Sequence, residues 1–236
     1  MRLSLFEIVC GIGFILMMTL GPALTGFFFT SSAADKSVNA HLPTITDAPV
    51  GSLLNVSDKP GLGSIMAKAV LVEFSDYECP YCKHHAAETA PKLIQEFIST
   101  GQLRLVFVNN PLSSHSNAEF LAFAAICSEE QNQFWPMHDA LFNSEVNGMG
   151  DLMNIANRTN VETGALKKCV ETSNRPQERL IADLEDVKKL GLTATPSFAL
   201  GKLNGNGDAV LQKFIIGDQP IGTFRNLIKA MNLPGK

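Results

Sequence analysis

The chain has 236 residues, of which 45% are hydrophobic and 18% are charged, so it carries enough apolar material for one sizeable core. Its formal net charge is -4 at pH 7 and its Lys and Arg residues form no run, which argues against a basic surface for nucleic acid. We therefore expect one main globular domain and no nucleic acid partner.

The N-terminal residues 1–30 differ in composition from the rest of the chain. From Ile8 to Phe29 there is no charged residue for about 22 positions, which is enough to cross a bilayer as a helix. Small residues from Ser31 to Ala34 leave a cleaved signal peptide as an alternative, and a buried helix of the folded domain is another. Because three phenylalanines extend the apolar run up to these serines, we expect a retained membrane anchor. Either membrane alternative places the remaining chain outside the cytoplasm, in the periplasm or at the cell surface.

A predicted tether and a strand–helix–strand unit follow. Residues 31–62 contain many small and polar residues and few large apolar ones, so we expect a flexible tether. The run Lys68–Phe74 is typical of a strand buried on both faces. Helix-forming residues extend from Pro80 to Ser99, and Pro91 within them predicts a kink. A second strand at Leu103–Val108 completes a right-handed parallel unit.

The remaining chain is helical first and then changes to strands. Between about residues 112 and 190 the helical pattern has no strand signal within it. Two strands, Pro196–Leu200 and Ala209–Gly217, flank a turn rich in Gly, Asn and Asp, which predicts a hairpin. An amphipathic helix follows. The order βαβ, helical block, ββα predicts an α/β domain at residues 63–236 with a helical insert.

The motif Cys79-Pro80-Tyr81-Cys82 lies at the start of the first predicted helix. Residues three positions apart share a helix face, so the two sulfur atoms can approach within disulfide reach. Cys79 falls at the helix cap, where free N–H groups and the helix dipole stabilise a thiolate. Cys82 lies one turn deeper and is shielded. This asymmetry predicts an attacking and a resolving cysteine in thiol–disulfide exchange, a reaction that needs no cofactor or metal.

Two other functions compete with this prediction. Zinc would use Cys79, Cys82 and one or both of His84 and His85 as ligands, but adjacent histidines on a helix cannot easily turn to one metal. A peptide-binding chaperone module would use the motif only as a staple. A purely structural disulfide does not need a helix N-terminus that stabilises a thiolate. Thiol–disulfide exchange is therefore the leading hypothesis.

Four segments carry a resemblance to the DsbA-like branch of the thioredoxin superfamily, the exported thiol–disulfide oxidoreductases. In the family's order they are LVEFSDYECPYCKHHAAETAPKLIQEF, RLVFVNNPL, AAICSEEQNQFWPMHDALF and GLTATPSF. The likeness runs from about Gly63 to Leu233 and implies a thioredoxin fold with a helical domain inserted in its middle. It also implies that Cys79 is the nucleophile, that Cys82 resolves, and that Pro196 is a cis-proline facing them.

The resemblance extends to the surroundings of the cysteines. It implies that the backbone of Thr195 pairs with a substrate peptide, and we expect Pro196 and Tyr81 to contact that peptide. Glu73 lies at the same spacing before the two cysteines as an acidic residue of the family. Either it points to a sheet edge, or it is buried with a raised pKa and relays a proton to or from Cys82.

The other histidines, the tryptophan and the remaining cysteines are assigned to less specific roles. We expect His84 and His85 to be solvated, with a modest electropositive contribution to the thiolate as the alternative. His115 and His138 are assigned to structure, and Trp135 to the core of the insert. Outside the apolar segment two further cysteines remain, Cys127 and Cys169. In an oxidising compartment we expect a structural disulfide between them, with two buried thiols as the alternative.

Together these observations predict an exported enzyme that oxidises the dithiols of secreted or extracytoplasmic proteins through a Cys79–Cys82 disulfide. A disulfide isomerase or reductase of the same fold is the alternative. No second folded module appears between the anchor and Val70, which argues against the dimeric isomerases. The expected partners are reduced or unfolded exported proteins and a membrane redox protein that recycles the cysteines.

Overall fold

The computed structural model describes residues 45–231. The predicted anchor at 1–30 and the first part of the predicted tether, residues 31–44, lie outside the described residues. Within 45–231, no helix is both long enough and apolar enough to cross a membrane.

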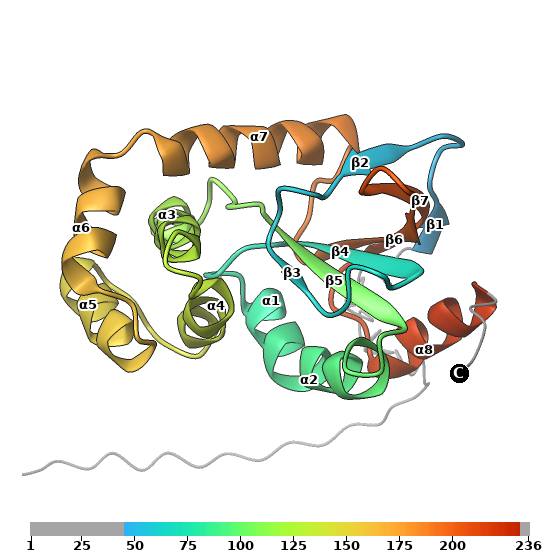
Figure 1. Ribbon diagram of the computed structural model, residues 1–236, viewed down its shortest axis with the longest axis horizontal. Coiled ribbons are helices and arrows are strands. Elements are labelled where there is room, and N and C mark those ends of the chain that lie inside the picture. Colours follow the sequence, from blue (N-terminus) through green and yellow to red (C-terminus); the bar gives the residue numbers. More distant parts are fainter. Residues whose placement is uncertain (1–44, 232–236) are drawn as a thin grey trace, which may run out of the picture. The chain divides into compact units, whose positions relative to one another are not determined.

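The described chain is built on one mixed sheet of seven strands in the order β1-β7-β6-β4-β5-β3, with β2 also paired to β7 (Figure 1). The strands are β1 Ile45–Asp47, β2 Leu53–Asn55, β3 Gly61–Leu62, β4 Ala69–Ser75, β5 Leu103–Asn109, β6 Ser197–Leu203 and β7 Asp208–Ile216. The central strand β4 is parallel to β5 and antiparallel to β6. The parallel pair confirms the predicted βαβ unit, and the antiparallel β6–β7 pair confirms the predicted hairpin.

The prediction of a tether is wrong for residues 45–62, which contain β1, β2 and β3. β1 and β2 pair with β7, and β3 pairs with β5. These strands are two or three residues long, and Leu54 is the only fully buried residue among them. Such short, mostly exposed strands show no alternation of apolar and polar residues, so sequence periodicity cannot reveal them.

The helix after β4 widens into π-helical turns on both sides of Pro91. Its consecutive parts are α1 Pro80–His84, η1 His85–Thr89, α2 Ala90–Leu93 and η2 Ile94–Ile98. The Ala90 N–H donates to the carbonyl oxygen of His85, five residues earlier. The irregularity expected at Pro91 therefore takes the form of widened turns, which accommodate a ring that has no N–H to donate.

Five helices lie between β5 and β6 and form the insert, which extends beside the sheet in Figure 1. They are α3 Ala118–Glu129, α4 Phe134–Phe142, α5 Met149–Arg158, α6 Thr163–Thr172 and α7 Arg175–Lys189. The last helix, α8 Ile221–Ala230, follows β7. The predicted order of elements is thus found in the structure.

Side chains of β4 alternate between two hydrophobic clusters. Val72 packs in a cluster with Val187 of α7, whereas Leu71 packs in a cluster with Leu93 of α2. Because alternate residues of a strand share a face, Glu73 has the same orientation as Leu71. The strand therefore directs this carboxyl group under the helix that carries the cysteines.

A third cluster joins the insert to the start of that helix. It contains Tyr77, Cys79 and Cys82 together with buried side chains of α3 to α6. Trp135, expected in the core of the insert, is only partly buried and packs against both this cluster and the Leu71 cluster. Its indole N–H donates to the carbonyl oxygen of Gly61 at 3.2 Å. Trp135 therefore joins the insert to the edge strand β3.

A buried ion network fastens α7 to the sheet. Lys59 Nζ lies 2.9 Å from Asp183 Oδ1 and 2.8 Å from Asp186 Oδ2. The second oxygen of Asp183 accepts hydrogen bonds from the backbone and side-chain N–H groups of Asn109, at the end of β5. Burial by itself would lower the pKa of Lys59, but the two carboxylates outweigh it and raise that pKa.

The Lys59→Met variant tests this network. Removing Lys59 leaves the buried Asp183 with Arg179 as its remaining cation, whose Nε lies 3.7 Å away, so we expect a loss of about 3 kcal/mol in the free energy of unfolding. The matched control is Lys213→Met, because Lys213 pairs with Asp47 at the surface. An exposed pair contributes less than about 1 kcal/mol. Urea unfolding that gives equal losses for the two variants would contradict the assignment.

A disulfide joins Cys127 of α3 to Cys169 of α6, with Cα atoms 5.9 Å apart and a sequence separation of 42. The pairing closes most of the insert into one loop. On the chain-entropy model, closing a loop of this length stabilises the folded state by about 4 kcal/mol.

The double variant Cys127→Ser/Cys169→Ser is expected to lose about that free energy of unfolding, roughly 4 kcal/mol, and to keep thiol exchange at Cys79. Denaturant unfolding measures the first effect, and the reaction of the reduced protein with a dithiopyridine reagent measures the second. Stability equal to that of the parent protein would count against a structural role for the bond.

Candidate active site

Cys79 lies where the end of β4 turns into α1. Its N–H donates to the carbonyl oxygen of Asp76 at 3.1 Å, and its backbone is extended, with φ -65° and ψ 122°. Cys79 is therefore the N-cap of α1, and Pro80 occupies the first turn. This arrangement directs the unpaired N–H groups of the first turn at the Cys79 sulfur atom.

The two cysteines of the motif are free thiols with opposite environments. The pKa of Cys79 is lowered to about 5, chiefly by a hydrogen bond from the Cys82 thiol; burial opposes this effect, and the Thr195 side chain and two backbone N–H groups add to it. The pKa of Cys82 is raised far above its ordinary value, first because the side chain is buried and then because it bonds to Cys79. The reduced pair is therefore a Cys79 thiolate beside a Cys82 thiol.

Glu73 is buried under this helix, with 2% of its surface exposed. Burial raises its pKa, while the charge of His85 and the hydroxyl of Ser75 act in the opposite direction. The Ser75 hydroxyl also lowers the pKa of Cys82, so it lies near both groups. Sequence analysis missed Ser75, although its position two residues after Glu73 in a strand puts it on the same face.

The loop before β6 faces Cys79. The Thr195–Pro196 peptide bond is cis, and the Thr195 carbonyl oxygen lies 3.4 Å from the Cys79 sulfur atom. On the helix side, Tyr81 is 65% exposed. The fold thus gathers the predicted residues Cys79, Cys82, Thr195 and Pro196 around one sulfur pair.

The two histidines after the motif differ, and the expectation that both are solvated is wrong for His85. His84 is largely exposed, and its Nδ1 pairs with Asp218 Oδ2. His85 is 1% exposed, packs against the rings of Phe198 and Phe224, and has its Nε2 3.9 Å from Glu73. The sequence could not show this difference because η1 replaces regular α-helix at His85 and changes which side chains face the sheet.

Two carboxylates tie the turn before Cys79 to the loop between β5 and α3. Asp76 Oδ1 accepts from the Glu78 N–H, and Asp76 Oδ2 accepts from the Leu112 N–H and pairs with His115 Nδ1, each at 2.8 Å. Glu78 accepts from the backbone N–H of Asn117 at 2.6 Å. Sequence analysis did not connect these two loops.

His138 lies in an aromatic cluster under the site. This position agrees with the structural role assigned to it from the sequence. Its Nδ1 lies 3.1 Å from the Tyr77 hydroxyl, and its ring centroid is 4.6 Å from that of Phe107. Burial lowers its pKa to about 3, so the ring is neutral at physiological pH. His138 therefore adds packing but no charge to the site.

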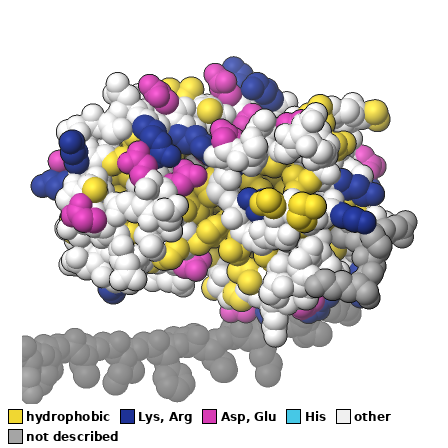
Figure 2. Space-filling model, in the orientation of Figure 1, with side chains coloured by type: hydrophobic (Ala, Val, Ile, Leu, Met, Phe, Trp, Pro, Cys, Tyr) yellow, Lys and Arg dark blue, Asp and Glu magenta, His cyan; other side chains and the backbone are white. Residues whose placement is uncertain are grey.

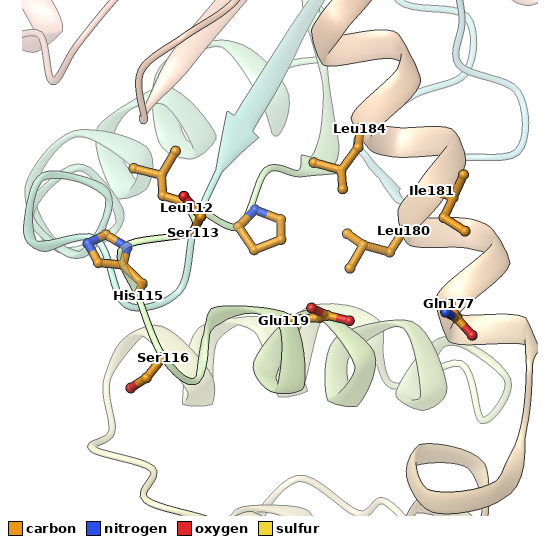
Figure 3. Close-up of a pocket in the computed structure, with 10 residues that line it drawn as sticks. Leu112, Ser113, His115, Ser116, Glu119, Gln177, Leu180, Ile181 and Leu184 are labelled. Carbon is orange, nitrogen blue, oxygen red and sulfur yellow. The ribbon is translucent and has the colours of Figure 1, made fainter.

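Two pockets border these residues. One, of about 500 Å³, lies between α3, α7 and the loop that contains His115, and Figure 3 shows Ile181 and Leu184 of α7 on its far wall. The other, of about 440 Å³, is lined by Glu73 and Trp135. Figure 2 shows hydrophobic side chains gathered on the viewed face between the helical insert and the sheet. The viewed face therefore carries apolar surface of the kind that peptide segments contact.

No group of three or more His, Cys, Asp or Glu side chains is placed to hold a metal ion within residues 45–231. His84 and His85 turn to Asp218 and Glu73.

Comparison with known proteins gives a consistent result. The family model described as thioredoxin matches residues 56–214. Disulfide bond formation protein D of Bacillus subtilis is 27% identical over 187 residues, which cover 74% of this chain and 79% of that protein. The probable disulfide bond formation protein D of Bacillus anthracis is 28% identical over 159 residues, 64% of this chain and 71% of that protein.

Two solved structures share the fold. Alpha-DsbA1 of Wolbachia pipientis has a TM-score of 0.64 at 23% identity and covers 75% of this chain and 92% of its own. Oxidised BdbD of Bacillus subtilis has a TM-score of 0.63 at 22% identity and covers 78% of this chain and 98% of its own. These comparisons confirm the resemblance to the DsbA-like branch and the fold it implies.

Alkylation of the reduced protein by iodoacetamide should show the difference between the two thiols. Because only the thiolate reacts, the rate at Cys79 is expected to rise with pH around a midpoint of about 5 and then to level off. Cys82 should stay unmodified at neutral pH. Peptide mass spectrometry identifies the labelled residue, and a midpoint near 8.5 would contradict the stabilised thiolate.

Proposed function

This chain belongs to the thioredoxin family, and on that premise we propose that it is an extracytoplasmic thiol–disulfide oxidoreductase that oxidises pairs of thiols in exported proteins. The observation that carries the proposal is the opposite shift of the two cysteine pKa values, down for Cys79 and up for Cys82. A sulfur pair with one stable thiolate and one protonated partner suits reversible disulfide exchange.

In the proposed reaction a substrate thiolate attacks Cys79 of the Cys79–Cys82 disulfide. The bond between the two sulfurs breaks, a mixed disulfide forms with Cys79, and Cys82 leaves with the electron pair. Cys82 then takes a proton, since its pKa is high. The second substrate thiolate attacks the substrate sulfur of the mixed disulfide, and Cys79 leaves as a thiolate. Two electrons pass from the substrate to the enzyme.

Glu73 is the proposed source of the Cys82 proton. Burial raises the pKa of Glu73, which favours its protonated form, and the Ser75 hydroxyl lies near both Glu73 and Cys82. In the reverse direction the same carboxylate would accept the proton when Cys82 attacks a mixed disulfide.

Substrate contact is proposed at the loop that faces Cys79. A peptide in extended conformation would pair with the backbone at Thr195, next to the sulfur atom, and would contact Pro196 and the exposed ring of Tyr81. Recycling requires a membrane redox protein that accepts two electrons from the reduced pair. An anchor formed by residues 1–30 would keep the enzyme near such a partner.

The direction of electron flow follows from the thiolate. Whatever stabilises the reduced form makes the disulfide a stronger oxidant, so we propose a donor of disulfides rather than a reductant. Isomerase or reductase activity of the same fold is the second candidate, because the pKa of about 5 at Cys79 lies between the extremes known for activated cysteines, about 3.5 to 7.5.

Refolding of a reduced, disulfide-containing test protein is the direct assay. The oxidised enzyme should restore its activity, and the potential of the Cys79–Cys82 couple should lie at roughly -120 to -180 mV. Cys82→Ser should accumulate mixed disulfides on gels without reductant, whereas Cys79→Ser should form none. A potential near -270 mV would make the protein a reductant, and trapping through Cys82 would reverse the roles.

A further inference from the structure

Two carboxylates stand directly before the nucleophile. Asp76 is fully buried at its side chain and Glu78 is partly buried, and both lie within three residues of Cys79. Negative charge at this distance opposes a thiolate. The stable thiolate at Cys79 therefore requires that these charges be offset.

The negative charges of the two carboxylates are compensated in different ways. Glu78 is held by the neutral donors of Asn117, its backbone N–H and its side-chain amide. Asp76 accepts two backbone N–H groups and also pairs with His115, the only basic side chain in ion-pair contact with it among the described residues. The charge beside Cys79 thus depends on whether the His115 imidazole carries a second proton.

His115 can exchange that proton with solvent. Its side chain is 23% exposed, whereas that of Asp76 is fully buried. Figure 3 shows His115 at the edge of the large pocket, across from Leu184 and Ile181 of α7 and on the same side as the loop residue Leu112. Glu119 of α3 lines the same pocket and is the other charged side chain there. The other groups that line this pocket are therefore acidic, apolar or neutral.

The charge of Cys79 also contributes to the pKa of His115. The pKa of His115 is raised first by its hydrogen bond to Asp76, against some desolvation, and then by the charges of Asp76, the Cys79 thiolate and Glu78. Interaction between two titrating groups is reciprocal, so a protonated His115 stabilises the thiolate by the same free energy with which the thiolate stabilises the imidazolium.

We propose that His115 is a redox-linked proton site: when the Cys79–Cys82 disulfide is reduced, the imidazole held by Asp76 takes up a proton and thereby stabilises the Cys79 thiolate. This inference rests on one part of the proposed function, namely that Cys79 is the cysteine that becomes a thiolate. His115 does not contact the reacting atoms and is a positioning residue that acts through Asp76.

The reaction balances with this site included. A substrate dithiol gives up two electrons and two protons to become a disulfide. The enzyme disulfide accepts the two electrons, one proton ends on Cys82, and Cys79 remains an anion. The second proton is shared between His115 and solvent: with a pKa difference of half a unit between the two redox states, about a quarter of the molecules at most bind it at His115, and in the others it goes to solvent. The oxidising power of the enzyme therefore increases as the pH falls through the titration range of His115.

The first test uses NMR titration of the His115 ring in the oxidised and the reduced protein. We expect the pKa of His115 to be higher in the reduced form by about half a unit, which corresponds to a threefold change in proton affinity. Equal values in the two redox states would refute the proposal. This measurement needs neither a variant nor a substrate.

The second test uses His115→Gln, which keeps a donor for Asp76 but cannot carry the charge. The pKa of Cys79, measured by thiolate absorbance, should rise by the same half unit, and the equilibrium constant against glutathione should shift about threefold toward the disulfide, or roughly 15 mV. The shift in equilibrium constant should fade at high pH, once His115 of the parent protein has also lost its charge.

Two variants separate charge from structure. His115→Lys restores a positive charge and should return the Cys79 pKa toward the parent value, whereas Lys213→Gln removes a distant surface charge and should leave it unchanged. Failure of the lysine variant to restore the pKa, with both proteins folded by circular dichroism, would leave only a structural role for His115. If the titrations agree with the proposal but reduced test proteins are not oxidised, the proposed function fails and the proton site stands.

Discussion

The hydrogen bond from the Cys82 thiol to the Cys79 sulfur is the interaction on which the chemistry of this fold depends. It lowers the pKa of one cysteine and raises that of the other, so two identical side chains acquire different roles. The bond exists because Cys79 caps the helix with an extended backbone while Cys82 lies one turn inside it. The central strand and the widened helix hold this cap in place.

Support for the cap comes from three directions, each with a different physical character. Below it, Glu73 and Ser75 project from β4 and supply polar groups in an otherwise apolar layer. Beside it, the Thr195 carbonyl approaches the Cys79 sulfur. The insert contributes the aromatic packing around Tyr77. The insert thus shapes the reactive centre in part by packing, through the hydrophobic cluster that it shares with Tyr77, Cys79 and Cys82.

Elements with strong periodicity were predictable from the sequence, and so were the residues that gather at the end of β4. The two parallel strands are largely apolar runs, interrupted by Glu73 and Arg104, and the cap is marked by Cys79-Pro80. The strands in residues 45–62 were missed because their hydrogen bonds come from long-range pairing with β5 and β7, which leaves no local pattern. The contact between Asp76 and His115 joins residues 39 positions apart, and no spacing rule links two loops. Burial of His85 depends on a π-helical turn, which the regular helical repeat cannot anticipate.

The disulfide between Cys127 and Cys169 has a consequence for how the protein matures. A newly made chain acquires this bond only by losing two electrons, and that is the change the proposed activity brings about in other proteins. Copies already folded could therefore form this bond in new ones. The chain would then be one of its own substrates.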